Sequence, residues 1–483
     1  MTSDAIARPE AAAVPARPDP VQAKPAQAKA ARAKPAGSRW AGPYAVAGGL
    51  FLVYLVLSVG RFRRMDWASW DLGIFEQAIR AYAHLQEPVA DLKGPGANIL
   101  SDHFSPVIAL AAPLYRLFPG PLTLLVVQAA LFALSAVPVT RAAGRLLGRA
   151  RGVAIGIAYG LSWGVQRAVE FDFHEIAFAM PLLAFSLEAV LARRWRAALL
   201  WALPLVLVKE DLGFTLAALA VVVTWRAWTT DRRTAWTALG VAAFGAVFAV
   251  LVFTVFIPAF ATEGYGYWHK IDGGGPFAGT GTKLATLGWV LIPTTGLLAL
   301  RSPLLLVAAP TLGWRFLSGD DHYWSTDWHY SAVLMPVVSL ALVDAIDTFR
   351  RSERPRLRAY SLQLPTAVLA AGLALAATAM PTAKLAEART YEKPDRVTAI
   401  ERLLDRIPDG ATVEADTTPL TRLTSRCRVL WIGGSKGVVP DWITIDNSSR
   451  WAGDPAVYAG QLHPGERYTL VGEAAGIVLL QRG

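Results

Sequence analysis

The chain of 483 residues is 54% hydrophobic, contains 17 tryptophans and has a mean hydropathy of +0.36, which excludes a soluble globular protein and indicates a polytopic membrane protein. Its formal net charge is +10, from 47 basic and 37 acidic residues. The basic residues gather in an N-terminal tail and in short loops between apolar runs, so this charge indicates membrane orientation and excludes nucleic acid as a partner.

Residues 1–39 form a basic segment of low complexity, rich in alanine, proline and lysine, which we expect to be a disordered cytoplasmic tail. The first long apolar run follows at residues 42–60. It lacks a small-residue cleavage site, so we expect an uncleaved signal anchor whose basic flank stays in the cytoplasm.

Ten further apolar runs alternate with loops, and every second loop is rich in arginine. The runs lie at residues 121–140, 152–164, 176–191, 197–208, 212–225, 235–257, 284–300, 303–316, 331–346 and 361–379. Because cytoplasmic loops carry the excess of arginine and lysine, residues 40–381 are predicted to form an all-α polytopic domain of about 11 transmembrane helices. The N-terminus would be cytoplasmic and the C-terminus outside. Arg61, Arg63 and Arg64 are the exception, since they follow the first run on the side assigned to the outside.

The predicted outer loop 61–120 is polar sequence that we expect to carry interfacial helices. After Asp71, apolar residues recur at helical spacing opposite a polar face. The apolar positions are Leu72, Phe75, Ala78, Ile79, Tyr82 and Leu85, and the polar positions are Glu76, Gln77, Arg80 and His84. This pattern predicts an amphipathic helix along the bilayer surface. Asp71 is then either the N-cap of that helix or a general base above the membrane.

Ionisable residues cluster in three of the loops predicted to lie outside. They are Asp102, His103, Glu170, Asp172, His174, Glu175, Lys209, Glu210 and Asp211. Such a cluster at a membrane face is either a set of hydrated loop charges or a ligand site. Asp172, His174 and Glu175 could also supply ligands to a divalent metal ion, and no other cofactor follows from the sequence.

Aromatic residues in the later outer loops are candidates for stacking on sugar rings or on isoprenoid, although tryptophan and tyrosine also mark membrane interfaces by default. These residues are Tyr265, Tyr267, Trp268, Tyr323, Trp324 and Trp328.

The apolar density drops in residues 382–483, where a helical stretch precedes five short runs of β-forming residues. The helix is expected at residues 396–407, and the strands at residues 411–415, 428–432, 442–445, 468–471 and 476–480. We therefore predict a small α/β domain outside the membrane.

The sequence resembles a bacterial family of membrane proteins defined by a domain of unknown function, DUF2079. The resemblance lies in residues 71–77 (DLGIFEQ), 103–106 (HFSP), 171–174 (FDFH), 209–213 (KEDLG) and 329–330 (HY). It covers the chain from about residue 50 to the end. The family name implies no activity.

More distantly, the layout is similar to that of the GT-C superfamily of membrane glycosyltransferases. These proteins have a first span, a long outer loop with an acidic residue near its start, many further spans and often an outer soluble domain. Residues 103–106 resemble the proline-rich segment of that superfamily, with the single Pro106 in place of two prolines.

The second resemblance implies transfer of a sugar from a polyprenyl-phosphate donor to a cell-envelope glycan or protein acceptor at the outer face of the cell membrane, with inversion. Asp71 matches the base that deprotonates the acceptor hydroxyl. Lys209, His174 and His103 are candidates for stabilising the leaving phosphate, and Glu210 and Asp211 for orienting Lys209. The other expected substrate-binding residues are Asp172, Glu76, His329 and Tyr330.

Two alternatives come from other classes of protein, namely a transporter or flippase of a lipid-linked glycan and a non-catalytic cell-envelope scaffold. Transporters place ionisable residues near the bilayer midplane, often in repeated halves. The predicted spans carry almost no charge at mid-depth and show no internal repeat, which favours the enzyme.

Overall fold

The computed structural model describes residues 1–2, 37–66, 70–261, 277–447 and 453–483. Most of the predicted tail lies outside the described residues. So do three of the aromatic residues considered for stacking, Tyr265, Tyr267 and Trp268.

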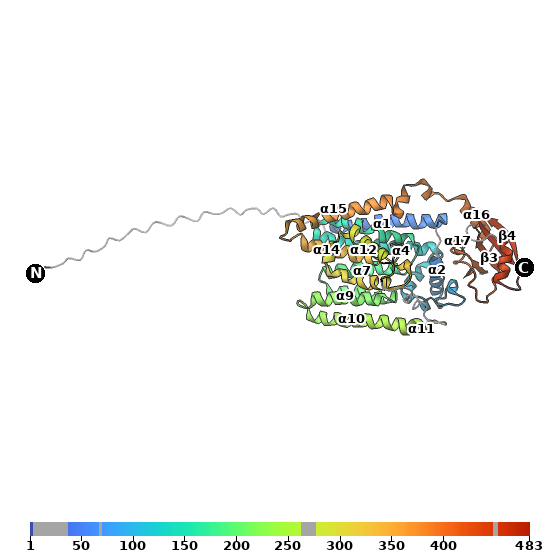
Figure 1. The fold of residues 1–483 in the computed structure, drawn as a ribbon, viewed down its shortest axis with the longest axis horizontal. Helices are drawn as coiled ribbons and strands as arrows, with labels where there is room; N and C mark the ends of the chain where they lie inside the picture. Colours follow the sequence, from blue (N-terminus) through green and yellow to red (C-terminus); the bar gives the residue numbers. More distant parts are fainter. Residues whose placement is uncertain (3–36, 67–69, 262–276, 448–452) are drawn as a thin grey trace. The chain divides into compact units, whose positions relative to one another are not determined.

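The described chain is mostly helical, and its long helices lie side by side in a bundle (Figure 1). Among the described residues, four apolar segments are long enough to cross a membrane: Ala41–Arg64, Pro121–Leu147, Arg232–Phe260 and Pro355–Thr378. They correspond to α1 (Gly37–Arg64), α4 (Pro121–Leu147), α10 (Arg232–Leu251) with its extension, and α15 (Pro355–Thr378). The helical membrane architecture is therefore confirmed, whereas the count of 11 spans stays a prediction.

The other predicted runs form shorter helices. They are α7 (Ile176–Leu191), α9 (Leu212–Ala227), α12 (Thr280–Thr295), α13 (Ala309–Leu317) and α14 (Leu334–Phe349). One predicted span, residues 152–164, is divided between α5 (Arg149–Gly160) and α6 (Trp163–Glu170). Another consists of α8 (Trp195–Ala202) and a 3-10 helix (Leu203–Leu207) that has a proline in its first turn, where no backbone donor is needed.

Helices α9 and α10 lie along each other at one edge of the bundle (Figure 1). They approach closely because Gly213 of α9 faces Gly245 of α10. A Cβ atom added at Gly245 would lie only 2.6 Å from the carbonyl oxygen of Gly213. The two glycines thus allow direct backbone contact between these helices.

The predicted amphipathic helix is α2 (Trp70–Ala83), and its apolar face is buried as expected. Its polar face is not turned to water but contacts the C-terminal region. The amide of Gln77 donates to the carbonyl oxygen of Val429 (2.8 Å), and Arg80 donates to that of Thr424 (3.0 Å). Asp71 lies inside the first turn, after Trp70, so it is not the N-cap residue.

The C-terminal region forms a five-stranded sheet in the order β2-β1-β3-β5-β4. Its strands are β1 (Thr412–Ala415), β2 (Arg428–Trp431), β3 (Trp442–Asp446), β4 (Tyr468–Ala474) and β5 (Ile477–Arg482). Strand β1 pairs parallel with β2 and β3, and β5 pairs antiparallel with β3 and β4. Helices α16 (Asp395–Leu404), α17 (Thr417–Leu420) and α18 (Pro455–Leu462) accompany the sheet. The small α/β fold is confirmed, and its location outside the membrane stays a prediction.

The glycine contact between α9 and α10 can be tested by enlarging one side. We expect Gly245→Leu to destabilise the protein by about 1–3 kcal/mol, because the side chain must displace the facing backbone. Thermal unfolding in detergent micelles measures this. Gly240→Leu in the same helix is the control, since no atom lies within 4 Å of a Cβ there. Equal losses in both variants would contradict the packing described.

Candidate functional site

A cavity of about 940 Å³, called here the Asp71 cavity, collects most of the ionisable residues singled out in the sequence. Its polar lining comes mainly from the starts of helices and from loops. These residues are Asp71, Lys93, Asp102, His103, His174, Lys209, Glu210, Asp211, His329 and Tyr330. Its apolar lining comes mainly from α9, from α10 and its extension, and from α13. These residues include Phe214, Val250, Phe253, Pro310, Trp314 and Leu317.

Four charged side chains form a continuous chain along the polar lining. The Lys209 ammonium lies 2.7 Å from Glu175 Oε1, and Glu175 Oε2 lies 2.7 Å from His174 Nδ1. His174 Nε2 in turn lies 3.6 Å from Asp71 Oδ2. Glu175 is fully buried, so it is held entirely by these partners. The chain connects the starts of α2, α7 and α9.

The ionisation states of His174, Glu175 and Lys209 are set mainly by their charged neighbours in this series of contacts. Burial lowers the pKa of His174, but Glu175 and Asp71 outweigh it and raise the pKa to about 9. Burial raises the pKa of Glu175, yet Lys209 and His174 bring it well below its usual range. Burial also opposes the charge of Lys209, but Glu175 and Glu210 raise its pKa well above the usual value. All three side chains are therefore charged at neutral pH.

His329 stacks on His174 with a distance of 3.6 Å between ring centroids. Burial and the positive charge of His174 hold the pKa of His329 well below its usual range. His329 is thus the neutral partner of a charged imidazole, and among the described residues its buried Nδ1 atom has no hydrogen-bond partner.

A hydrogen-bonded pair and an ion pair also line the cavity. His103 Nδ1 lies 2.8 Å from Glu210 Oε1, and the Lys93 ammonium lies 3.0 Å from Asp102 Oδ2. The pKa of Asp211 is raised to about 6, by burial and by the neighbouring charge of Glu210. The lining therefore offers both cations and carboxylates to a ligand.

The turn between α6 and α7 sets the position of His174. Asp172 adopts a left-handed backbone conformation (φ 73°), which aspartate tolerates better than most residues. Gln128 of α4 holds this turn from both sides. Its amide nitrogen donates to the carbonyl oxygen of Asp172 (2.5 Å), and its oxygen accepts from the backbone N–H of His174 (2.9 Å).

A family model described as a predicted membrane protein, DUF2079, matches residues 61–270 and 276–479. The chain belongs to the DUF2079 family. No curated protein sequence matches it.

Solved structures resemble this DUF2079 protein in fold. ArnT from Cupriavidus metallidurans bound to undecaprenyl phosphate has a TM-score of 0.57 and 15% sequence identity, and the match covers 92% of this chain and 98% of that one. The apo state of the same protein has a TM-score of 0.50 and 14% identity, with the same coverage. The likeness to GT-C membrane proteins predicted from the sequence is confirmed at the level of the fold.

Two predicted substrate-binding residues of the DUF2079 chain do not line the cavity, Glu76 and Asp172. Glu76 is fully buried on the opposite side of α2, where it accepts hydrogen bonds from Tyr115 (3.0 Å) and from the Thr424 hydroxyl. The 3.6-residue helical repeat places Glu76 away from Asp71, and the sequence could not reveal the surface that covers it. Asp172 contributes its backbone to the turn instead.

In the part of the chain that the structure describes, Asp172, His174 and Glu175 do not form a group whose three ligand atoms all lie within 4.8 Å of one another, and the predicted metal set stays a prediction. Within the described ranges, the one group of three whose ligand atoms lie within 4.8 Å of one another is Asp320, Asp321 and His322. Two of these three are exposed, a common arrangement for surface acids without an ion.

Sequence reasoning missed Lys93 and Gln128 as site residues. Gln128 gave a signal, since it is a lone amide within a predicted span, and polar residues there usually have a role. Of the aromatic candidates, Tyr323 lines the Asp71 cavity, whereas the Trp324 indole donates to the carbonyl oxygen of Ser318 (2.8 Å). Trp328 lines a different cavity, described below.

The contact of Glu76 with the C-terminal region makes stability depend on pH. Burial raises the pKa of Glu76 from 4.5 to about 7, so the folded protein binds this proton more tightly than the unfolded chain. Stability from this group is present below pH 4.5 and is lost as the pH rises to about 7. Glu76→Gln should therefore stabilise the protein at pH 8 by up to about 3 kcal/mol relative to its effect at pH 5.

Thermal unfolding of both proteins across this pH range is the measurement. The exposed Glu87→Gln change is the matched control and should leave the pH dependence of the wild type intact. If Glu76→Gln lowered stability equally at pH 5 and pH 8, the ionisation of Glu76 would not be the cause.

Proposed function

We propose that this DUF2079 protein transfers a sugar from a polyprenyl-phosphate donor to an acceptor hydroxyl at the outer face of the membrane, with inversion. The observation that carries the proposal is one cavity in which a carboxylate, Asp71, and the cationic side chains of His174 and Lys209 share a space with an extended apolar wall. Such a lining suits a ligand with a charged head and a hydrocarbon chain.

The apolar wall offers the lipid a route from the bilayer. Val250 and Leu317 line the cavity and are 50% and 64% exposed, so the wall reaches the surface of the bundle. A polyprenyl chain could lie there with its phosphate toward the charged residues. The solved structure of ArnT, which shares this fold, carries undecaprenyl phosphate, and this supports a ligand of the same chemistry here.

Asp71 would act as the general base. Its carboxylate is a quarter exposed in the cavity and lies 3.6 Å from His174, so it remains accessible to an acceptor hydroxyl. In the proposed step, Asp71 takes the proton of that hydroxyl, the oxygen attacks the anomeric carbon, and the polyprenyl phosphate leaves with the electron pair of the broken bond. Inversion follows from this single displacement.

The charge that develops on the leaving phosphate would be stabilised by His174 and Lys209. Their positive charges are held in place by buried Glu175, which lies between them, and need no reorganisation as the reaction proceeds. His103 is oriented by Glu210 and would be a further donor on the same lining. His329 and Tyr330 complete the substrate contacts in this proposal.

The role of Asp71 is tested by sugar transfer from a panel of radiolabelled polyprenyl-phosphate sugars with purified protein in lipid. We expect Asp71→Asn to lower the rate by about 10²–10⁴-fold, because the isosteric amide cannot accept the proton. The matched control is Asp409→Asn, whose side chain is 81% exposed and lines neither cavity.

Equal rates in the wild type and Asp71→Asn would remove Asp71 from the chemistry. Absence of transfer with every donor would overturn the enzyme and favour the transporter of a lipid-linked glycan. Transport can then be measured directly, as movement of the same labelled donor across vesicles that contain the protein.

The pH dependence of transfer tests the role of His174. Because its pKa is about 9, its positive charge is present below that pH and is lost above it. We expect kcat/KM to fall as the pH rises through about 9. In His174→Gln the rate should be lower at neutral pH, and the fall near pH 9 should disappear. A fall of the same midpoint in the variant would assign it to another group.

A further inference from the structure

A second cavity of about 770 Å³, called here the basic cavity, lies where the C-terminal end of α1 meets α6 and the segment after α15. Six of its lining side chains are cationic: Arg61, Arg64, Arg167, Lys384, Arg389 and Arg396. Four are acidic: Asp66, Glu170, Asp327 and Glu387. Cations therefore exceed carboxylates by two. Among the described residues, the basic cavity and the Asp71 cavity share no lining residue.

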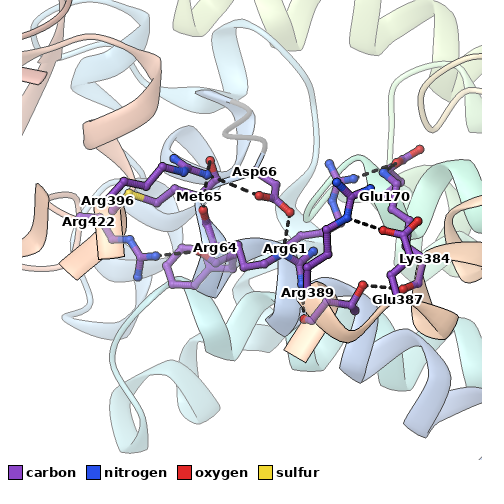
Figure 2. A network of polar contacts seen from close by, with 12 residues as sticks. Arg61, Arg64, Met65, Asp66, Glu170, Lys384, Glu387, Arg389, Arg396 and Arg422 are labelled. Carbon is purple, nitrogen blue, oxygen red and sulfur yellow. Dashed lines mark hydrogen bonds and ion pairs between the residues drawn. The ribbon is translucent and has the colours of Figure 1, made fainter. Parts of the chain in front are cut away.

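The excess of positive charge is concentrated around Glu170. Figure 2 shows this carboxylate among several cations. It lies 2.8 Å from Arg61 Nη1, 3.0 Å from Arg167 Nη1 and 3.2 Å from the Lys384 ammonium. Burial raises the pKa of Glu170, but Arg61 and Lys384 outweigh this effect and lower it. One negative charge thus faces three positive charges.

A second set of contacts crowds cations around Asp66. Arg64 and Arg396 both lie against this carboxylate, at 2.6 Å and 3.4 Å (Figure 2). Arg64 also donates to the carbonyl oxygen of Thr390. Glu170 and Asp66 are therefore each shared by two or more cations, whose positive charges lie close together. This proximity is unfavourable unless a further anion binds between them.

Arg61 has a hydrogen-bond donor that a ligand in this cavity could use. Its side chain is only 7% exposed, and its buried Nε atom has no hydrogen-bond partner within the described parts of the chain. A buried guanidinium donor without a partner is costly, so such groups usually meet a ligand, an ion or water. Phe171 and Trp328 complete the wall with a T-shaped contact at 4.9 Å.

We propose that the basic cavity binds the phosphate group of a second ligand, separate from the ligand of the Asp71 cavity. A phosphomonoester carries close to two negative charges at neutral pH and so matches the two excess cations. Arginine guanidinium groups bind phosphate oxygens through two parallel hydrogen bonds, and five arginines lie on this lining. The inference rests on the charges of this cavity and not on the sugar-transfer reaction.

The phosphate could belong to a soluble phosphomonoester or to a lipid head group, and two probes distinguish these sources. The full-length protein is placed in phosphatidylcholine nanodiscs, and binding of glycerol 3-phosphate is measured by calorimetry. In parallel, dioleoyl phosphatidic acid is added to the bilayer, and retention of this lipid is measured by native mass spectrometry. Binding of either probe that weakens as salt rises supports the proposal.

The double variant Lys384→Gln with Arg389→Gln tests the assignment without disturbing buried structure, because these side chains are 47% and 82% exposed. We expect it to weaken binding of the active probe about tenfold or more, since two charge-assisted hydrogen bonds to the phosphate are lost. Arg61→Gln should weaken it further. Arg428→Gln is the control, since Arg428 pairs with Asp91 outside the cavity.

Asp71→Asn separates this site from the other cavity and should bind the probe as the wild type does. Three outcomes would overturn the proposal: no binding of either probe, an equal loss in Arg428→Gln, or loss of binding in Asp71→Asn. Each of these can occur whether or not the protein transfers sugar, and transfer activity can fail while phosphate binding persists.

Discussion

The buried carboxylate of Glu175 is the constraint on which the Asp71 cavity depends. A fully buried charge is tolerated only when it is paired, and Glu175 has two cationic partners, Lys209 and His174. Because these partners come from different parts of the chain, the requirement fixes the start of α7 against the start of α9. It also keeps His174 protonated beside Asp71. The contacts that hold α7 against α9 are therefore the same contacts that set the charges in the candidate site.

Helix α2 connects the Asp71 cavity to the C-terminal sheet region. One side of the helix presents Asp71 to the cavity, and the opposite side contacts the sheet region through Gln77, Arg80 and Glu76. The C-terminal region thus helps to set the position of the carboxylate without contributing any lining residue to the cavity. The sheet region therefore affects the site indirectly, through its contacts with α2.

The sequence predicted most helices and all five strands because apolar runs and β-forming runs are local signals. It also identified nine residues of the polar lining, since ionisable residues in loops of a membrane protein are conspicuous. It failed for Glu76 because helical periodicity separates two faces but cannot say whether water or protein covers the polar one. Gln128 was missed because its partners, Asp172 and His174, lie more than 40 residues away in the sequence, whereas the pairing of Lys93 with Asp102 depends on how one loop folds back on itself. The break between α5 and α6 depends equally on packing that the sequence does not display.

The turn between α6 and α7 contributes lining residues to both cavities. Glu170 faces the basic cavity and His174 the Asp71 cavity, and the left-handed conformation of Asp172 lies between them. Phe171 lies between residues of the two cavities, since its ring contacts Trp328 of the basic cavity and stacks on His174 of the Asp71 cavity at 5.5 Å. A ligand that moved Glu170 would act on a segment that Gln128 holds at two backbone positions. The turn is therefore one direct physical connection between the two cavities, and the stacking of His329, the neighbour of Trp328, on His174 is another.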